Sequence, residues 1–524
     1  MLTKYSNPKQ EVKSDALHFI FKYRLFFAWL AIYFIIFIMA YFRPIHQDDG
    51  WYASYALRLI QKLNPEEQLS YWSFLDANDS DMSIGFIFSS LQVPFYLTFG
   101  FNVFAVRVLN SILLTLSVYL AFQIVKTIAK RFEWLFVFLL LVNPIFYYHF
   151  YNRPEVVALV LVLLSILLML KKDKKHYDMF FAFALWGLII DAHPIAILSV
   201  FGIGLWTFYD NPNFRKQIVL GGIIGLGFYF IGNKVINGNF GLFNAFFNGE
   251  KPGIGDHYIP IFESNLNDFS RIFINRWNGL KLTIIFSGVW LIVPILFYRK
   301  AILSRTEIAI VFNLIIFVIL STLLTEASGN GWALYALAVF LLTYVILIKH
   351  LRKTFALKSC YAIIIILIPL MLYSTASTSR RLYINISKSH YARNNFNNVN
   401  WDSCLPSNSK VLMRPTFVFE LANRNLLVDL PFGILNVMKN NKISFKEAII
   451  KRKYDYIAID ERSLNNELLI NVRELWTQPY YREFNETGIT REGFQQLIDQ
   501  GFLQYHCSVF EPMHGETVIY RINY

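Results

Sequence analysis

The chain has 524 residues, of which 55% are hydrophobic, 17% aromatic and 16% charged. Soluble proteins have about 45–50% apolar and about 25% charged residues, so this composition excludes a soluble enzyme, a disordered chain and a collagen-like rod. The formal net charge is +13. Lys and Arg fall in short clusters between apolar runs. Such clusters are better explained by the orientation of the chain in a membrane than by nucleic-acid binding, so no nucleic-acid partner is expected.

Apolar runs long enough to cross a bilayer recur along the chain. A span needs about 20 apolar residues, because the hydrocarbon layer is about 30 Å thick and the helix must satisfy every backbone polar group internally. The first run, 25–41, follows a basic segment without a cleavage site and is interpreted as an uncleaved signal anchor. About eleven spans are predicted in all, the others at 104–125, 134–151, 156–170, 179–191, 194–209, 218–236, 282–298, 307–324, 332–348 and 360–376.

The connections between these spans divide by charge. Basic clusters fall on one side of the scheme, whereas the short connections opposite them carry only Arg153. Because short cytoplasmic loops collect Lys and Arg, the N-terminus is predicted in the cytoplasm and the tail outside. The clusters are Lys126/Lys130/Arg131, Lys171/Lys172/Lys174/Lys175, Arg215/Lys216, Arg299/Lys300/Arg305 and Lys349/Arg352/Lys353/Lys358.

The first outer loop, 43–103, contains two predicted elements. In the first, one helical face collects Tyr52, Tyr55, Ala56, Leu59 and Leu63, while Ser54, Arg58 and Gln61 turn away. This pattern predicts an amphipathic helix in the plane of the membrane interface. The second, 84–99, is interpreted as a partly inserted or interfacial element, because a full span here would invert every later loop against the charge rule.

A second outer loop is predicted at 237–280, and the composition changes abruptly at about residue 378. This change separates a membrane domain, 1–377, from an outer domain, 378–524. In the outer domain, strand-like runs alternate with helical patterns, which predicts a small α/β domain. The runs begin at Lys410, Leu426 and Tyr456, and the helical patterns lie at 444–452 and 491–501.

Three cysteines are too few for a disulfide framework. Cys360 lies in an apolar run, so only Cys404 and Cys507 could pair. The sequence leaves open whether they do.

Two adjacent carboxylates, Asp48 and Asp49, follow the first span. Their charges repel each other, which becomes useful if one of them must take a proton from a substrate. The structural alternative is that one of them caps the amphipathic helix, accepting hydrogen bonds from its free N–H groups. The two roles are compatible.

The sequence Arg153-Pro154-Glu155 opens the fourth span. Pro at a first helical position and Glu in a first turn are ordinary helix-start signals, so a purely structural reading is available. The topology nevertheless places Arg153 and Glu155 on the same side as Asp48 and Asp49. These four side chains could therefore converge on one pocket.

The sequence Asp191-Ala192-His193-Pro194 interrupts an apolar run. Pro194 breaks the helix by removing an amide donor, and Asp191 or His193 could satisfy the freed backbone groups in a purely structural turn. Ionisable groups at membrane depth are functional candidates, and in that reading His193 donates to an anionic headgroup.

In their order and sidedness these motifs resemble the membrane-embedded GT-C glycosyltransferases, in particular the relatives of protein O-mannosyltransferases and the lipid A aminoarabinose transferase (glycosyltransferase family 39-like). The resemblance covers most of residues 20–375 and implies a GT-C-like helical membrane domain. The extracytoplasmic α/β domain behind it is predicted from the charge rule and the strand and helix patterns. The resemblance rests on a basic N-terminus and one span, then Asp48-Asp49-Gly50-Trp51-Tyr52-Ala53, Phe104-Ala-Val-Arg107-Val-Leu, Arg153-Pro154-Glu155 and the His193-Pro194 break.

The resemblance implies an enzyme that moves a sugar from a polyprenyl-phosphate donor to a lipid, glycan or protein acceptor. Carried over from the family, Asp48 is the base of an inverting single displacement, and Asp49 and Glu155 support it or position the acceptor. The pair is usually Asp-Glu, whereas this chain has Asp-Asp.

A second departure concerns the donor phosphate. The family often has a basic residue or His with prolines where this chain has Asp81-Met-Ser-Ile-Gly85. The expected phosphate contacts therefore shift to Arg58, Arg153 and His193.

The sequence requires no cofactor, since it has neither a Walker loop nor a dinucleotide fingerprint. A divalent cation held by Asp48, Asp49 and Glu155 stays open, because oxygen-only sites suit Mg²⁺ or Mn²⁺. The resemblance favours a metal-free site.

By resemblance, the expected location is a bacterial inner membrane, in contact with its lipids. The main rival function is a transporter or flippase of a lipid-linked or anionic solute, which often has two matching halves with charges near the midplane. Here no second half mirrors the first, and the acidic pair lies outside a span end, which favours an enzyme. A third reading is a non-catalytic scaffold.

Overall fold

The computed structural model describes residues 23–43, 47–63, 85–128, 133–143, 150–236, 304–324, 400–413, 417–421, 425–429, 443–460, 491–511 and 515–524. Shorter described stretches are 146, 238, 337–338, 341–346, 372, 375–380, 382–384, 386–387, 434 and 438. The predicted span 282–298, all but one residue of the loop 237–280, and most of the spans 332–348 and 360–376 lie outside these residues.

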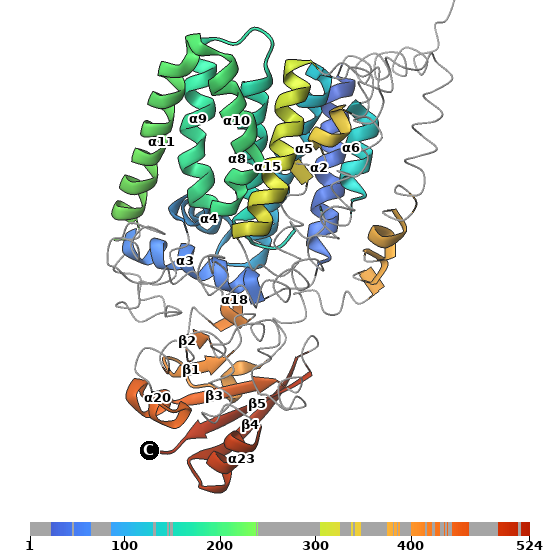
Figure 1. Cartoon of the computed structure of the whole chain (residues 1–524). Helices are drawn as coiled ribbons and strands as arrows, with labels where there is room; N and C mark the ends of the chain where they lie inside the picture. The colour runs from blue at the N-terminus through green and yellow to red at the C-terminus, as the bar shows by residue number, and fades with distance from the viewer. Residues whose placement is uncertain are drawn as a thin grey trace, which may run out of the picture.

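The membrane domain is a bundle of helices that run roughly side by side (Figure 1). Three described segments are long and apolar enough to cross a membrane: α2, α5 and Pro212–Ile236, which contains α11. The expected class, a mostly helical polytopic protein, is confirmed, and the number of eleven spans stays a prediction. The bundle helices are α2 (Arg24–Tyr41), α5 (Val103–Ile128), α6 (Glu133–Leu141), α8 (Glu155–Leu170), α9 (His176–Ala192), α10 (Leu198–Asp210), α11 (Arg215–Ile236) and α15 (Arg305–Leu324).

Successive described helices alternate in direction, so the described basic connections, 171–175 and the start of α11 at Arg215, lie at one end of the bundle (Figure 1). The connection 171–175 joins α8 to α9 at this end. Arg305, at the start of α15, forms an ion pair of 3.3 Å with Asp210 at the end of α10. The start of α8 at Glu155 and the break after α9 therefore lie at the opposite end, as the sequence predicted.

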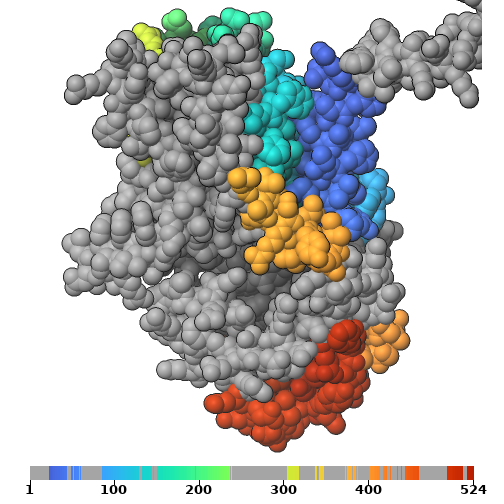
Figure 2. Space-filling model, turned by 90° about the vertical axis from the view of Figure 1, so that its right-hand side faces the viewer, coloured from blue at the N-terminus to red at the C-terminus, as the bar shows by residue number. Residues whose placement is uncertain are grey.

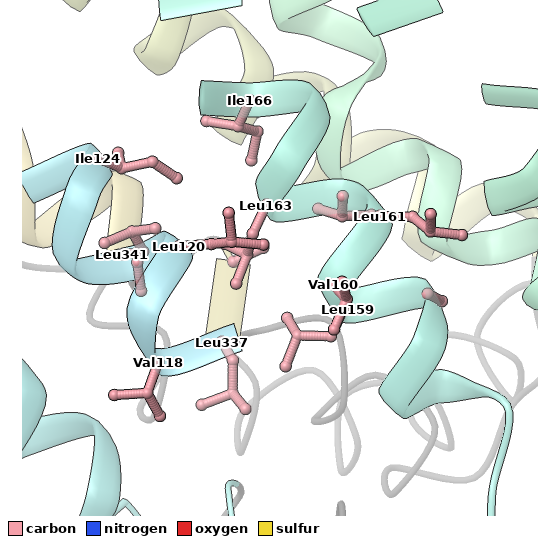
Figure 3. Close-up of a cluster of buried hydrophobic side chains, with 14 of the residues drawn as sticks. Val118, Leu120, Ile124, Leu159, Val160, Leu161, Leu163, Ile166, Leu337 and Leu341 are labelled. Carbon is pink, nitrogen blue, oxygen red and sulfur yellow. The ribbon is translucent and has the colours of Figure 1, made fainter. Parts of the chain in front are cut away.

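The centre of the bundle is filled by branched aliphatic side chains. Figure 3 shows Val118, Leu120 and Ile124 of α5 meeting Leu159, Leu163 and Ile166 of α8, with Leu337 and Leu341 beside them. All of these side chains are buried. Close packing of this kind, rather than exclusion of water, holds helices together in lipid.

A close approach joins α9 to α11. A Cβ atom on Gly187 would lie only 1.8 Å from the backbone oxygen of Gly225, and one on Gly225 would lie 2.5 Å from the oxygen of Ala184. Small residues permit this distance between helix backbones, which is a common device in membranes. Glycine is therefore required at both positions.

The predicted break between α9 and α10 is confirmed. Helix α9 ends at Ala192, and a 3-10 turn, η1 (Pro194–Ile197), leads into α10. Pro194 has no N–H and cannot continue the hydrogen-bond ladder of α9.

A side chain of α15, Asn313, forms hydrogen bonds with two backbone groups of α10 just beyond this break. The Asn313 amide accepts from the Ile203 N–H at 3.1 Å and donates to the Ser199 oxygen at 2.8 Å. These two backbone groups, four residues apart, are the pair that a regular helical turn joins. Asn313 thereby fixes α15 to α10 through buried hydrogen bonds.

Two helices of the first outer loop lie across the end of the bundle away from the basic connections (Figure 1). They are α3 (Gln47–Leu63) and α4 (Phe86–Phe99). Helix α4 has 14 residues, a length of about 21 Å at 1.5 Å per residue, which is shorter than the hydrocarbon layer. It corresponds to the element predicted at 84–99.

One predicted span contains a shorter helix than its predicted range. Helix α6 ends at Leu141, whereas the prediction ran from 134 to 151. The cause is local: Pro144 disfavours a helical conformation at Asn143 and supplies no N–H to the ladder.

The tail contains a five-stranded mixed sheet in the order β2-β1-β3-β5-β4. Strand β1 pairs parallel with β2 and β3, whereas β5 pairs antiparallel with β3 and β4. The predicted α/β class is confirmed, but the hairpin of β4 and β5 was not predicted. The elements are β1 (Lys410–Met413), α18 (Val418–Leu421), β2 (Leu426–Asp429), α20 (Phe445–Arg452), β3 (Tyr456–Asp460), α23 (Arg491–Asp499), β4 (Leu503–Glu511) and β5 (Gly515–Ile522).

Local signals explain two features of the tail. Helix α20 begins with a capping box, in which the Ser444 hydroxyl accepts from the Glu447 N–H and the Glu447 carboxylate accepts from the Ser444 N–H. Cys404 and Cys507, whose pairing the sequence left open, form a disulfide with a Cα–Cα distance of 5.9 Å. This bond joins the start of the described tail to the edge strand β4.

The bundle and the sheet are connected by the segment that contains residues 375–387. Figure 2 shows it in orange beside α2 and α6 and above the red end of the tail. The Thr378 hydroxyl donates to the Val142 oxygen at 2.8 Å, which fastens the segment to the end of α6. The domain boundary at 377 stays a prediction.

Helix α3 lies between the bundle and the tail domain (Figure 1). On one side the Tyr52 ring meets Phe88 of α4, with ring centres 5.8 Å apart. Ser54, expected on a polar face, is 1% exposed, because α3 is covered on more than one side. The apolar residues on the other side form the α3 cluster, whose members include Ala53, Ala56, Leu57, Ile60, Val93, Tyr96, Val103, Trp401, Phe417, Val418, Phe419 and Leu421.

We predict that Phe419→Ala loosens this junction. The Phe419 ring is 4% exposed and lies 5.3 Å from the Phe101 ring, and truncating a buried Phe costs about 3–5 kcal/mol. Thermal unfolding in detergent is expected to begin about 10 °C lower. Phe510→Ala is the matched control, because Phe510 is 72% exposed; an equal loss in both variants would contradict the assignment.

Candidate active site

The second residue of the acidic pair is held in a buried ion pair. Asp49 lies in the first turn of α3 and is 0% exposed, and Arg107, near the start of α5, is 1% exposed. The guanidinium donates to both carboxylate oxygens, at 3.2 and 3.0 Å. A two-pronged contact of this kind fixes the orientation of both side chains.

The turn before α8 meets the same carboxylate. The Asn152 N–H donates to Asp49 Oδ1 at 2.7 Å, and the Asn152 side chain donates to the Asp49 backbone oxygen at 3.0 Å. We call α3 the acidic helix because it carries Asp48 and Asp49. Because Asn152 is only three residues before Glu155, these bonds join the acidic helix directly to the Arg153–Glu155 turn. The structure therefore brings Asp49 next to the turn that carries Arg153 and Glu155. Convergence of all four side chains on one pocket stays a prediction.

Further contacts fix this turn to α5 and to the end of α2. Arg107 also donates to the Phe150 oxygen at 2.5 Å. The Asn110 side chain donates to the Tyr151 oxygen at 3.0 Å, and the Arg43 guanidinium lies 3.3 Å from the centre of the Tyr151 ring. The turn is thus held from two helices before α8 begins.

Arg153 and Glu155 form the second ion pair of the site, with Nη2 and Oε1 at 2.8 Å. Arg153 is 29% exposed, whereas Glu155 is 2% exposed. Among the described residues, Glu155 Oε2 has no hydrogen-bond partner. His193, after α9, lies close enough to both side chains to interact with their charges.

Asp191, the other ionisable residue of this break, contacts the start of α4. Its carboxylate caps α4, accepting from the Phe86 and Ile87 N–H groups, the latter at 2.8 Å. The Asn233 side chain of α11 donates to the other oxygen at 2.6 Å. A Cβ atom on Gly85 would lie 1.7 Å from the Asp191 backbone oxygen, so glycine is required where α4 meets α9.

Of the predicted site residues, Asp49, Glu155, Arg153 and His193 are described and lie at one end of the bundle. Asp48 and Arg58 lie on α3, but their side chains lie outside the described residues. The roles of all six stay predictions. Within the described part of the chain, no group of three or more His, Cys, Asp or Glu side chains is arranged to hold a metal ion.

Sequence reasoning missed three polar side chains of this region. Arg107 was part of a family motif but had no role, and Asn152 and Gln92 were not singled out. Each is at most 1% exposed. An Arg and a Gln inside otherwise apolar helices were the available signal, because buried polar groups in membrane helices require partners.

The fold and this site define a polytopic helical membrane protein with a small α/β domain at the end that carries the acidic helix. No family model matches the chain, and no curated protein matches its sequence. Its fold is similar to the crystal structure of ArnT from Cupriavidus metallidurans bound to undecaprenyl phosphate. The TM-score is 0.55 at 12% identity, covering 95% of this chain and 98% of the ArnT chain.

A second ArnT structure, in the apo state, gives a TM-score of 0.54 at 12% identity, over 95% of this chain and 97% of that one. Archaeal oligosaccharyltransferase AglB from Archaeoglobus fulgidus, in complex with an inhibitory peptide and a dolichol-phosphate, gives a TM-score of 0.45 at 11% identity, over 95% and 74%. The resemblance to GT-C enzymes that the sequence indicated is confirmed, at the level of the fold, by ArnT.

We predict that Arg107→Leu is severely destabilising, by about 3–5 kcal/mol, because it leaves the Asp49 carboxylate buried without its cation. Replacing both partners, Arg107→Leu with Asp49→Leu, removes the uncompensated charge and is expected to recover part of the loss. Size-exclusion profiles and thermal unfolding in detergent measure both effects. A double variant as unstable as the sum of the single variants would show that the two charges do not stabilise each other.

Proposed function

We propose that this protein is an integral-membrane glycosyltransferase that moves a sugar from a polyprenyl-phosphate donor to a lipid, glycan or protein acceptor. The observation that carries the proposal is the hydrogen bond between Asp49 and the Asn152 N–H. It joins the acidic helix to the Arg153–Glu155 turn at one end of a bundle with the ArnT fold. The ArnT structure holds undecaprenyl phosphate, which supports a lipid phosphate as the donor class.

In the proposed reaction Asp48 removes the proton of an acceptor hydroxyl as its oxygen attacks the anomeric carbon. The bond between that carbon and the phosphate oxygen breaks, and its electron pair leaves with the polyprenyl phosphate. One displacement of this kind inverts the anomeric centre. If the acceptor is already an anionic phosphate, Asp48 orients it and takes no proton.

The leaving phosphate requires cations or hydrogen-bond donors. Arg153 fits this role because it is partly exposed while Glu155 holds one side of its guanidinium. His193 is close enough to this pair to interact with both charges. Arg58, one helical turn beyond the buried Ser54, is the third proposed phosphate contact.

The two described carboxylates have different proposed roles. The oxygens of Asp49 already accept from Arg107 and from Asn152, so Asp49 supports Asp48 by fixing the first turn of α3. Glu155 is buried with one oxygen unpartnered among the described residues, so it is the better candidate to accept from a sugar or acceptor hydroxyl.

No cofactor is proposed for this reaction. A divalent cation between Asp48, Asp49 and Glu155 would compete with Arg107 and Arg153, which already occupy oxygens of two of these carboxylates. The charge pattern of the described residues therefore supports a metal-free site.

The proposed location is a bacterial inner membrane, with the N-terminus and the basic loops in the cytoplasm and the tail domain outside. The collected basic connections support this orientation. The disulfide between Cys404 and Cys507 supports it independently, because such bonds persist in oxidising compartments. The acceptor side of the site then faces the α/β domain.

We predict that Asp48→Asn and Glu155→Gln each lower sugar transfer strongly, by about 10²–10⁴-fold for the proposed base. Purified protein in lipid vesicles receives a radiolabelled polyprenyl-phosphate sugar, and label in acceptor lipid and glycan is measured. Asp173→Asn is the control, because Asp173 is exposed at the opposite end of the bundle. Transfer that survives both site substitutions would refute the assigned residues, and movement of intact donor without transfer would favour a transporter.

We also predict that Ser379→Cys and Lys172→Cys react with a membrane-impermeant maleimide from opposite sides of intact cells. Both positions are exposed, the first beside the tail domain and the second in the α8–α9 connection. Ser379→Cys should react from outside and Lys172→Cys only after lysis. Equal labelling of both from outside would refute the proposed orientation.

A further inference from the structure

Polar contacts that are buried or partly buried connect the end of α9 to α4, and α4 through Asn152 to the acidic helix α3. At one end of these contacts, Asp191 accepts from the Ile87 N–H at 2.8 Å and from Asn233 at 2.6 Å. These contacts fix where α4 begins. Charge and hydrogen bonding both favour a carboxylate at this helix N-terminus.

In the middle of these contacts is Gln92, which is 1% exposed. Its Oε1 accepts from the Tyr96 hydroxyl at 3.0 Å and from the Asn152 side chain at 3.1 Å. Its Nε2 points to the Phe88 oxygen, at 3.4 Å. Contacts within α4 therefore orient the amide so that its oxygen faces Asn152.

At the far end of these contacts is Asn152 itself. The same side-chain nitrogen that meets Gln92 also donates to the Asp49 backbone oxygen, at 3.0 Å. Asn152 thus has one partner on α3 and one on α4, and it immediately precedes Arg153. The direction in which the Arg153–Glu155 turn faces is set by both helices.

We propose that Gln92 and Asp191 are positioning residues. They hold α4 in place, and α4 in turn holds Asn152. Asn152 then keeps the Arg153–Glu155 turn next to the acidic end of α3. Neither residue is assigned a contact with substrate. The expected change in kcat rests on the proposed function. The position of the Arg153–Glu155 turn can be tested without it. Displacing a reacting group by about 1 Å can cost about 10²-fold in rate, so small shifts of this turn are expected to matter.

The first test replaces Gln92 with Met, which fills a similar volume but whose thioether is only a weak acceptor for Asn152. For Gln92→Met we expect kcat per folded molecule to fall about 10–100-fold, with KM for the polyprenyl-phosphate sugar within about threefold of wild type. Thr98→Val is the matched control on the same helix, since the Thr98 hydroxyl donates to the Pro94 oxygen at an exposed position. A purely structural Gln92 would lower the yield of folded protein and leave kcat per folded molecule unchanged, which would overturn the proposal.

Hydrogen exchange of peptides covering residues 150–156 separates this inference from the proposed function. We expect faster exchange there in Gln92→Met and wild-type exchange in Thr98→Val. If wild-type protein transfers no sugar while this difference is present, the proposed function is refuted and the positioning role of α4 is supported. Equal exchange in both variants would refute the positioning role of α4, whatever the activity.

The second test concerns Asp191. Asp191→Asn keeps an oxygen that can accept from the Ile87 N–H but loses the charge at the start of α4, whereas Asp191→Ala removes the cap and the acceptor for Asn233. We expect kcat per folded molecule to fall about 10–100-fold in Asp191→Ala and less in Asp191→Asn. Unchanged kcat per folded molecule in Asp191→Ala would remove Asp191 from the proposal.

Discussion

The site depends on one contact, the buried ion pair between Asp49 and Arg107. Removing two charges from water is costly, and such a pair persists only where further hydrogen bonds complete it. Arg107 meets this condition by donating to Phe150 as well, and Asp49 does so by accepting from the Asn152 N–H. The pair therefore joins α3, α5 and the turn before α8, which are far apart in the sequence, into one unit.

This constraint also assigns a role to the tail domain. Helix α3, which carries the acidic pair, is held on one side by the bundle and on the other by the α3 cluster, to which the tail contributes Trp401, Phe417 and Phe419. The disulfide from Cys404 to Cys507 fastens the first of these segments to the sheet. The tail is thus part of the scaffold of the acidic helix, in addition to any contact with an acceptor.

Much of this arrangement could be predicted from the sequence, because helix direction alternates and basic loops share a side. These two rules place the acidic pair, Arg153, Glu155 and the His193 break at one end of the bundle. Strand and helix patterns likewise identified the α/β tail.

The remaining features required distances that a sequence does not contain. The partner of Asp49 lies 58 residues away, and the helix that Asp191 caps begins more than 100 residues before it. Strand β4 escaped prediction because a bulge between Tyr505 and Cys507 interrupts the alternation of exposed and buried residues along it. The local sequence pattern therefore predicts on which side of the membrane each motif lies. The hydrogen-bond partners of each side chain depend on long-range packing, which the pattern does not contain.

The central claim, that the acidic helix and the Arg153–Glu155 turn together bind one glycolipid headgroup, is tested most directly by a cryo-EM map of the protein with undecaprenyl phosphate. The account predicts phosphate density within about 3 Å of the Arg153 guanidinium, on the side of α3 that carries Asp48. Phosphate density at the basic end of the bundle, or separated from Arg153 by packed side chains, would contradict it.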